Sequence, residues 1–390
     1  SMSASEIRQY FRLRKLVEAN KKANTTLAFF TAEDVNFTKM TFYGAYYDER
    51  NNKWMKKILP LPDVVYVRGG GDGTRRLLEK FDGLGIKRIN PLTAFYKDEL
   101  FQVLRKDRTM RGFLPSTVII KEWDEVKRTV RKFGKAYIKA HRGRRGLQVM
   151  RIENAANQRG YWYSYSTLGK LVRKKAVNLD SAVKSAKSFF GEKKIIVQKA
   201  IDLVKLHNNR LVDFRAEVQR NRRGELDIVG VCVRVGQPNS PITTHASAYR
   251  YEDYLTKLFP RISKVQLNRL KDDIEDFLYT VYTAVEKKYG KFGEIGIDFG
   301  IDHNRKIWLI ECNAQSAKVS IVKAYGSKAD RIFLNPLEYA KTIAGSSEAL
   351  SARTDRVTAD PAAAGASETE TVGEMAAETQ GIHQERELMR

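Results

Sequence analysis

The chain has 390 residues, 42% of them hydrophobic, which is enough for two or three domains with a substantial core. No apolar stretch approaches the roughly 18 to 20 residues that cross a bilayer, and the first residues form no apolar signal segment, so we expect a folded cytoplasmic protein without a membrane span. The net charge of +24 favours an anionic partner, and composition does not choose between nucleic acid, acidic polymers, anionic surfaces and phosphorylated small molecules.

The positive charge is concentrated in the body of the chain. Residues 346–390 contain nine acidic and four basic residues, so residues 1–345 carry a net charge of +29. The same segment is rich in Ala, Thr, Glu and Ser and poor in large apolar side chains, so we expect an acidic disordered tail. Cys232 and Cys312 lie inside apolar runs, which favours small buried side chains over a disulfide or a metal site.

The first part of the chain alternates strand-like and helix-like stretches, which predicts a small α/β unit. We expect strands at 25–31, 40–48 and 63–71, a helix ending near Gly85, and a returning strand at 86–90. After Pro91, a helix at 93–107 precedes a strand, a turn and a helix that ends at Gly134.

The pattern then changes to hairpins, which predicts an α+β part. We expect strands within 135–153, 161–166, 194–202, 212–220, 227–236, 293–302 and 306–313, with helices near 178–190 and 264–289. The predicted fold class is therefore α/β followed by α+β.

The last two predicted strands carry acidic residues although the chain as a whole is strongly basic. A short polar turn joins them, so Asp298 and Glu311 can lie opposite one another, and Asn313 points to the same side as Glu311. Two carboxylates and an amide oxygen suit Mg²⁺. The alternative is that both carboxylates are half-exposed strand residues paired with lysines.

A lysine, a glycine-containing loop and a linker are candidates for binding a nucleotide. Lys139 ends a strand before a loop with Gly143 and Gly146, whose backbone amides could face phosphates, although a basic surface turn is the alternative. The strand that ends in the linker Gln198, Lys199, Ala200, Ile201 and Asp202 is similar to one that contacts adenine with backbone groups and ribose with an acid.

Two arginines interrupt the apolar patterns of their strands. Burying Arg215 or Arg234 without an anion is costly, so each is a candidate to bind a phosphate or a carboxylate. Salt bridges to Glu217, Asp213 or Glu225 are the alternative.

In this order, Lys97, Lys139 with its loop, the linker, Arg215, Arg234 and the acidic strand pair resemble the ATP-grasp superfamily. The stretch FFTAEDVNFTKMTFYGAYYDERNNKWMKKILPLPDVVYVR is similar to its YheC/YheD-like branch, usually described as endospore-coat-associated, and the resemblance spans about residues 25–340. It implies an N-terminal α/β domain at 1–90, a central subdomain at 91–200, a C-terminal antiparallel-sheet subdomain at 201–345 and the tail at 346–390.

The resemblance implies an ATP- and Mg²⁺-dependent ligase that works through an acylphosphate. Lys97 and Lys139 would hold the α- and β-phosphates, the loop with Gly143 and Gly146 would cover them, and the linker would bind adenine and ribose. Asp298, Glu311 and Asn313 would hold Mg²⁺, and Arg215 and Arg234 would act on the γ-phosphate or acylphosphate.

The chain departs from the ATP-grasp pattern at two places. His245 lies near the position where relatives carry a Gly-Gly pair, and AQSAK replaces the turn expected after Asn313. We expect ATP and an acidic peptide or small carboxylate as partners, with an anionic polymer as a further candidate. A non-catalytic protein that binds or assembles spore coat through basic runs such as KLVRKK and RNRRG is one alternative, and a kinase is another. Oligomeric state has no sequence signal.

Overall fold

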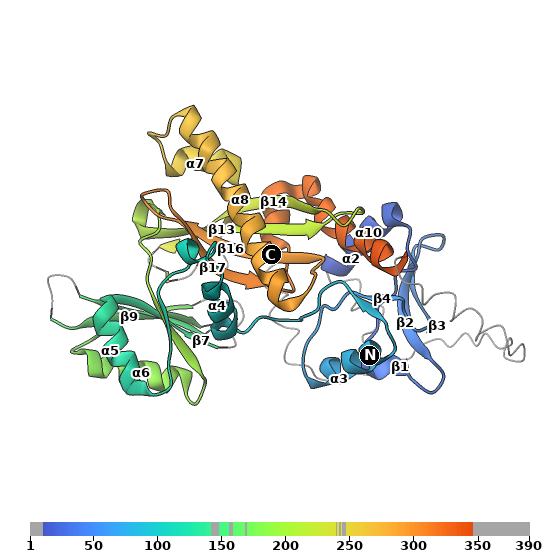
Figure 1. Ribbon diagram of the computed structural model, residues 1–390, viewed down its shortest axis with the longest axis horizontal. Helices are drawn as coiled ribbons and strands as arrows, with labels where there is room; N and C mark the ends of the chain where they lie inside the picture. The colour runs from blue at the N-terminus through green and yellow to red at the C-terminus, as the bar shows by residue number, and fades with distance from the viewer. Residues whose placement is uncertain are drawn as a thin grey trace, which may run out of the picture. The chain divides into compact units, whose positions relative to one another are not determined.

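The computed structural model describes residues 11–141, 148–155, 159–167, 170–238, 240–241, 243 and 247–345 (Figure 1). No helix in these ranges is both long enough and apolar enough to span a membrane. Cys232 and Cys312 are buried and free, which confirms the expectation of small buried side chains.

The N-terminal part combines an antiparallel sheet with a small parallel pair. Its elements are α2 (Phe11–Ala23), β1 (Val35–Asn36), β2 (Thr41–Asp48), β3 (Lys53–Pro60), β4 (Val64–Val65), α3 (Asp72–Gly83) and β5 (Lys87–Arg88), with sheets β1-β2-β3 and β4-β5. The expected strand at 25–31 is reduced to one bridge between Phe29 and Ala45. The strand β3 was not predicted, because three lysines interrupt its apolar residues.

The central part is a six-stranded antiparallel sheet with two helices on one face. After α4 (Lys97–Lys106), its elements are β6 (Thr117–Ile119), α5 (Trp123–Phe133), β7 (Lys135–Ala140), β8 (Val149–Asn154), β9 (Tyr161–Thr167), β10 (Lys170–Ala176), α6 (Leu179–Phe190) and β11 (Ile195–Lys199), in the order β10-β9-β8-β7-β11-β6. Along β7, Ala136, Ile138 and Ala140 pack into the core with α5 and α6. Strand alternation therefore turns Lys139 to the opposite face.

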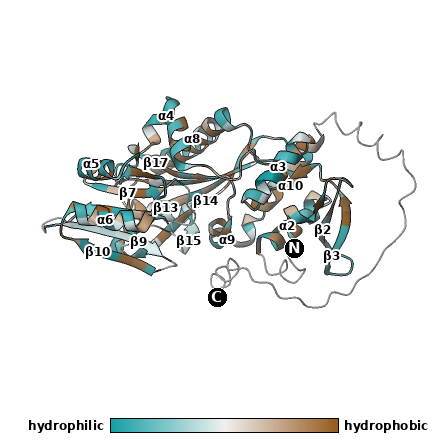
Figure 2. Ribbon diagram, turned by 90° about the horizontal axis from the view of Figure 1, so that it is seen from below, coloured by the Kyte–Doolittle hydropathy of each residue, from teal (hydrophilic) through white to brown (hydrophobic). Residues whose placement is uncertain are grey.

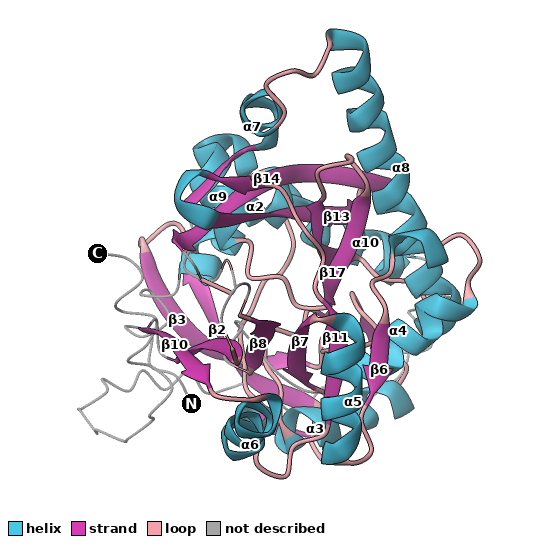
Figure 3. Cartoon of the chain, turned by 90° about the vertical axis from the view of Figure 1, so that its left-hand side faces the viewer, coloured by secondary structure: helices cyan, strands magenta, loops and turns pink. Residues whose placement is uncertain are grey.

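The C-terminal part is built on a second antiparallel sheet (Figure 3). Its elements are β12 (Lys205–Leu206), β13 (Arg210–Arg220), β14 (Leu226–Pro238), β15 (Ser247–Arg250), α7 (Tyr251–Leu258), α8 (Lys264–Tyr289), β16 (Glu294–Ile301), β17 (Ile307–Asn313), α9 (Val319–Tyr325) and α10 (Arg331–Gly345), with the order β15-β14-β13-β16-β17 and β12 on β13. Ser263 caps α8 by accepting from the backbone N–H of Gln266, and Gly290 follows its last residue.

The two faces of this second sheet differ in chemistry. Phe214, Ala216 and Val218 of β13 pack with Phe277 and Val281 of α8 in a buried apolar core. The alternate residues of β13 are polar and face the other side, towards α9, α10 and the segment after β17. The candidate site lies at one end of this polar face.

Candidate active site

Lys97 and Glu311 join the central part to the last strand of the second sheet. Lys97 is the first residue of α4, and its Nζ lies 2.7 Å from Glu311 Oε1. The backbone N–H of Lys97 donates to the carbonyl of His141, which directly follows β7, over 3.3 Å. The start of α4 is therefore fixed beside both the end of β7 and the acidic strand.

Lys139 is a cation without an anionic partner among the described residues. Its Nζ donates to Gln198 Oε1 of β11 over 2.6 Å, and Gln198 Nε2 donates in turn to Thr117 Oγ1. Burial and the nearby charge of Lys97 lower the pKa of Lys139 to about 8, against the opposing effect of Glu311. A partly buried ammonium held by a neutral amide is poised to gain from an anionic ligand.

The acidic strands meet as the sequence predicts. Asp298 of β16 lies opposite Glu311 of β17, and Asn313 lies opposite Gly296. The side chain of Glu311 is 34% exposed, and Nδ2 of Asn313 is shielded from solvent without a hydrogen-bond partner. Within the described ranges, no three His, Cys, Asp or Glu side chains converge as a metal site.

Both arginines are paired with carboxylates, Arg234 with Asp213, which the alternative interpretation of the sequence named, and Arg215 chiefly with Asp298, which it did not name. Arg215 donates through Nε and Nη2 to both oxygens of Asp298, the second over 3.0 Å. Arg234 donates to both oxygens of Asp213, at 2.6 and 2.8 Å, and its Nη2 lies 3.3 Å from Asp298 Oδ1. Glu225 instead pairs with Arg223 at 2.8 Å.

This arrangement sets the charge of Asp298. Burial would raise the pKa of Asp298, but Arg215 and Arg234 together lower it below the ordinary value, so the carboxylate stays ionised. Asp213 is buried beside the same cluster and also accepts from Thr243. The arginines are thus held in fixed orientations by a carboxylate on each side.

The AQSAK segment after Asn313 is anchored to the polar sheet face and to the N-terminal part. Gln315 Nε2 donates to the carbonyl of Gly69 over 2.7 Å. The hydroxyl of Ser316 donates to the buried Glu217 and accepts from Arg215 Nη1 at 3.2 Å. In place of the expected turn, the chain bends at Ala314 and Gln315 and runs to α9 without regular secondary structure, with Ala314, Ser316 and Lys318 buried.

Lys318 and Glu294 form the buried end of this network. Lys318 has a left-handed backbone, with φ of 62°, and its ammonium donates to Glu294. Tyr66 and Arg68, which follow β4, donate to Glu294 Oε1 at 2.7 and 2.9 Å. Burial would raise the pKa of Glu294, but Lys318 and Arg68 lower it below its ordinary value.

Four residues of this network, Ser316, Lys318, Glu294 and Arg68, are not among those that the sequence predicts for the site. The signal in the sequence that points to them is the alternation of polar side chains at Asp213, Arg215, Glu217 and Gln219 inside an otherwise apolar strand. Such alternation on a buried strand predicts a polar face that needs partners from elsewhere in the chain.

The linker begins in the last two residues of β11, and two of its backbone N–H groups are already used within the chain. The backbone N–H groups of Lys199 and Ala200 donate to the carbonyls of Ser116 and Lys135, at 2.8 and 3.0 Å. Ile201 follows them, and the side chain of Asp202 is 77% exposed, 3.9 Å from Lys205. Gly143, Gly146 and His245 lie outside the described residues.

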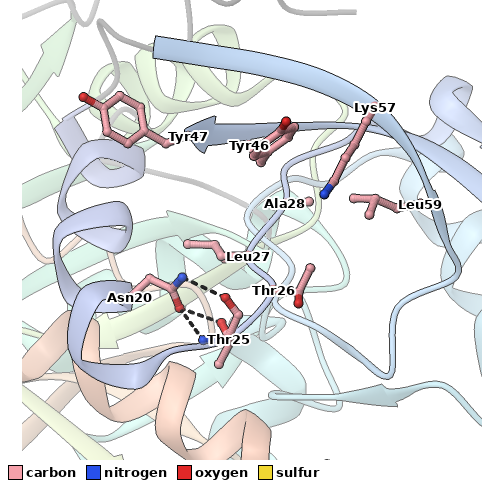
Figure 4. Close-up of a pocket in the computed structure, with 9 residues that line it drawn as sticks. All are labelled: Asn20, Thr25, Thr26, Leu27, Ala28, Tyr46, Tyr47, Lys57 and Leu59. Carbon is pink, nitrogen blue, oxygen red and sulfur yellow. Dashed lines mark hydrogen bonds between the residues drawn. The ribbon is translucent and has the colours of Figure 1, made fainter. Parts of the chain in front are cut away.

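A pocket of about 140 Å³ lies in the N-terminal part, between α2 and the strands β2 and β3 (Figure 4). Lys57 lies 4.6 Å from the ring centroid of Tyr46 at its wall, and Asn20 is hydrogen-bonded to Thr25. None of the candidate site residues lines it.

Comparison with known proteins gives a consistent family. The family model described as YheC/D like ATP-grasp matches residues 85–343. Endospore coat-associated protein YheD of Bacillus subtilis (strain 168) is 27% identical over 334 residues, covering 78% of this chain and 67% of that protein. Endospore coat-associated protein YheC of the same organism is 19% identical over 320 residues, covering 79% of this chain and 85% of that protein.

Among solved structures, ATP-grasp ligase PsnB in complex with a minimal precursor, Mg and ADP is similar over 85% of this chain and 96% of its own. The sequence identity is 12% and the TM-score is 0.48.

Proposed function

This chain belongs to the YheC/D-like ATP-grasp family, and from this premise we propose that it is an ATP-dependent ligase that joins a carboxylate to an amine through an acylphosphate. The observation that carries the proposal is the position of Lys139. It is a partly buried ammonium that, within the described part of the chain, hydrogen-bonds to an amide and has no carboxylate partner, beside Lys97 and across from the acidic end of β17.

In this proposal the two lysines bind the phosphates of ATP. Lys139 and Lys97 contact the α- and β-phosphates, and the loop with Gly143 and Gly146 covers them. The linker from Gln198 to Ile201 contacts adenine, and Asp202 accepts a ribose hydroxyl. Since Gln198 already binds Lys139, its side chain orients the lysine rather than reading the base.

The donor set near Asn313 fits Mg²⁺. Glu311 offers a carboxylate with one cationic partner, and Asn313 would contribute its side-chain carbonyl oxygen. Asp298 accepts from arginines through both oxygens, so it would share an oxygen with the metal. When bound, Mg²⁺ would offset negative charge on the transferring phosphoryl group.

The arginine pair acts on the reacting group. A substrate carboxylate oxygen attacks the γ-phosphorus, and the bond to the bridging oxygen of ADP breaks, giving an acylphosphate. An amine then attacks the acyl carbon, forming an amide, and phosphate leaves with the carboxylate oxygen and accepts the amine proton. Arg215 and Arg234 stabilise the charge on the phosphoryl oxygens, and Ser316 orients Arg215.

The net charge of +29 on residues 1–345 favours an acidic peptide or small carboxylate substrate. A positively charged surface raises the local concentration and the association rate of such a substrate.

A direct test measures ADP release that depends on both Mg²⁺ and an added carboxylate. We expect Glu311→Ala to lower this turnover by about a hundredfold, as for loss of a group that acts in the transition state. The control is Glu225→Ala, in the β13–β14 turn, which should leave turnover unchanged. Unchanged turnover in Glu311→Ala would rule out the assigned metal-binding role.

The second candidate function is a non-catalytic protein that uses its basic surface to bind or assemble spore coat. The names of the two Bacillus relatives and the basic body favour it. It predicts salt-dependent binding of polyanions with no nucleotide-induced rise in melting temperature.

A further inference from the structure

Strand β10, which contains the KLVRKK run, is the most basic exposed element of the central sheet. Four of its seven residues, Lys170, Arg173, Lys174 and Lys175, are basic, and each of them is exposed, as is Leu171. The proposed chemistry at Lys139 does not use any of them. A role for this strand must therefore be sought in binding.

The neighbouring strand supplies no negative charge to β10. Every residue of β10 is paired with β9, whose sequence YWYSYST has no carboxylate. Neither Lys170, Arg173 nor Lys174 forms an ion pair with any residue that the structure describes, and Arg173 lies 4.4 Å from the ring centroid of Trp162. A guanidinium stacked on indole keeps its N–H edge free for a carboxylate.

Strand β10 also ends the sheet. The strand order places β9 on one side of it and no described strand on the other, as Figure 2 shows. An edge strand presents backbone N–H and C=O groups that can hydrogen-bond to an extended peptide. The side chains of the edge strand then contact the side chains of the added peptide and give specificity. Nucleic acid lacks the complementary peptide groups, so the edge favours a peptide.

The register connects this edge to the candidate site. Arg173 lies opposite Ser164, Ser164 opposite Arg151, and Arg151 opposite Tyr137. Residues directly opposite in antiparallel strands share a face, and Tyr137 and Lys139 are two residues apart on β7. Arg173 thus lies on the face of the sheet that carries Lys139.

We propose that β10 is the docking strand for an extended acidic segment of a peptide substrate, which adds to the edge of the central sheet and places one carboxylate on Arg173, on the face that carries Lys139, and another on Lys174, on the opposite face. This rests on the proposed function only in calling the bound segment a substrate. The docking itself requires neither ATP nor turnover.

The chain contains a matched control. Strand β3 is the edge of the N-terminal sheet and is also rich in lysine, and Lys56 and Lys57 lie over the rings of Tyr43 and Tyr46, as Arg173 lies over Trp162. Reversing two charges there changes the net charge of the chain by the same amount as reversing two charges on β10.

The test is fluorescence anisotropy at physiological ionic strength with a labelled peptide of about ten residues, in which pairs of adjacent glutamates alternate with single threonines so that glutamates lie on both faces of the added strand. Reversing both charges (Arg173→Glu with Lys174→Glu) should weaken binding by about tenfold or more, whereas Lys56→Glu with Lys57→Glu should change it less than about twofold. Equal losses in the two variants, or none in the first, would overturn the proposal. Thermal melting checks that both variants fold.

Two further probes separate the related explanations. A peptide N-methylated at alternate residues should bind about tenfold more weakly, because it cannot pair as a strand; equal binding would overturn strand addition. Single-stranded poly(U) that binds β10 as tightly as the peptide would overturn peptide recognition. Peptide binding without ADP release would support the docking proposal and contradict the ligase proposal. ADP release with a small carboxylate but no peptide binding would support the ligase proposal and contradict the docking proposal.

Discussion

We expect the protonation of Lys139 to control the affinity of the chain for nucleotide. Its pKa is lowered to about 8, so the unbound protein loses this charge as the pH rises through 8. An anionic nucleotide favours the charged form, so binding above pH 8 requires uptake of a proton. We expect a non-hydrolysable Mg-ATP analogue to bind about tenfold more weakly near pH 9 than near pH 7.

The control for this pH dependence is Lys139→Arg, whose guanidinium stays charged over the whole range. Calorimetric titrations at each pH measure both affinity and proton uptake. Identical pH profiles for the two proteins would assign the titration to another group.

The same lowered pKa predicts that the charge of Lys139 lowers the stability of the protein without ligand while it favours nucleotide binding. Between about pH 8 and the ordinary lysine pKa of 10.5, the unfolded chain binds more protons at Lys139 than the folded chain does, so the free energy of unfolding rises with pH in this range. Below about pH 8, Lys139 is charged in the folded chain as well, and its burial lowers the stability of the protein without nucleotide. Lys139→Met should therefore raise the melting temperature near neutral pH while nucleotide binding is lost. A lower melting temperature would contradict this interpretation.

Ser316 connects Arg215 to the buried carboxylate of Glu217. Ser316→Ala removes the donor to Glu217 and an acceptor for Arg215, leaving buried polar groups unpaired. We expect the free energy of unfolding to fall by about 1 to 3 kcal/mol in urea denaturation. Ser185→Ala on α6, whose hydroxyl donates only within its helix, should change it by less than about 0.5 kcal/mol.

At the scale of elements, the close approach of AQSAK to β16 depends on a glycine. A Cβ at Gly296 would lie 3.0 Å from Arg215 Nη1 and 3.0 Å from the Ser316 side chain, so Gly296→Ala should displace both and weaken nucleotide binding. Gly83→Ala, at the end of α3 with no atom within 4 Å of the added methyl, is the control. Equal melting temperatures and affinities for the two variants would show that the approach is not tight.

The β16–β17 hairpin was predictable because strand alternation and a short turn fix which side chains share a face, and Asp298 does lie opposite Glu311. The pairing of Arg234 with Asp213 was among the predicted salt bridges, but that of Arg215 with Asp298 was not, since Asp298 was assigned to the metal. The path of AQSAK was not predictable, since its anchors at Gly69, Glu217 and Glu294 are distant in sequence. Strand β3 was not predictable from its own residues either, because the tyrosines over which its lysines lie belong to the neighbouring strand β2.

At the scale of the whole molecule, the charge on residues 1–345 predicts that the association rate of an acidic substrate depends on ionic strength. If an acidic substrate is steered by a net charge of +29, its kcat/KM should fall steeply as ionic strength rises, because screening shortens the range of the attraction. A small neutral amine acceptor should show little dependence in the same assay. Equal salt dependence for both acceptors would contradict steering by the basic body.

The central claim is that Lys97 and Lys139 bind the phosphates of Mg-ATP opposite Glu311 and Asn313. The most direct measurement is calorimetric titration of a non-hydrolysable Mg-ATP analogue into the full chain, into Lys139→Met, and into Lys127→Met on α5, which pairs with Asp180 on the helix-covered face of the same sheet. We predict one site per chain, a loss of affinity of about tenfold or more in Lys139→Met, and no change in Lys127→Met. Absence of binding by the unaltered chain, or undiminished binding by Lys139→Met, would contradict the claim.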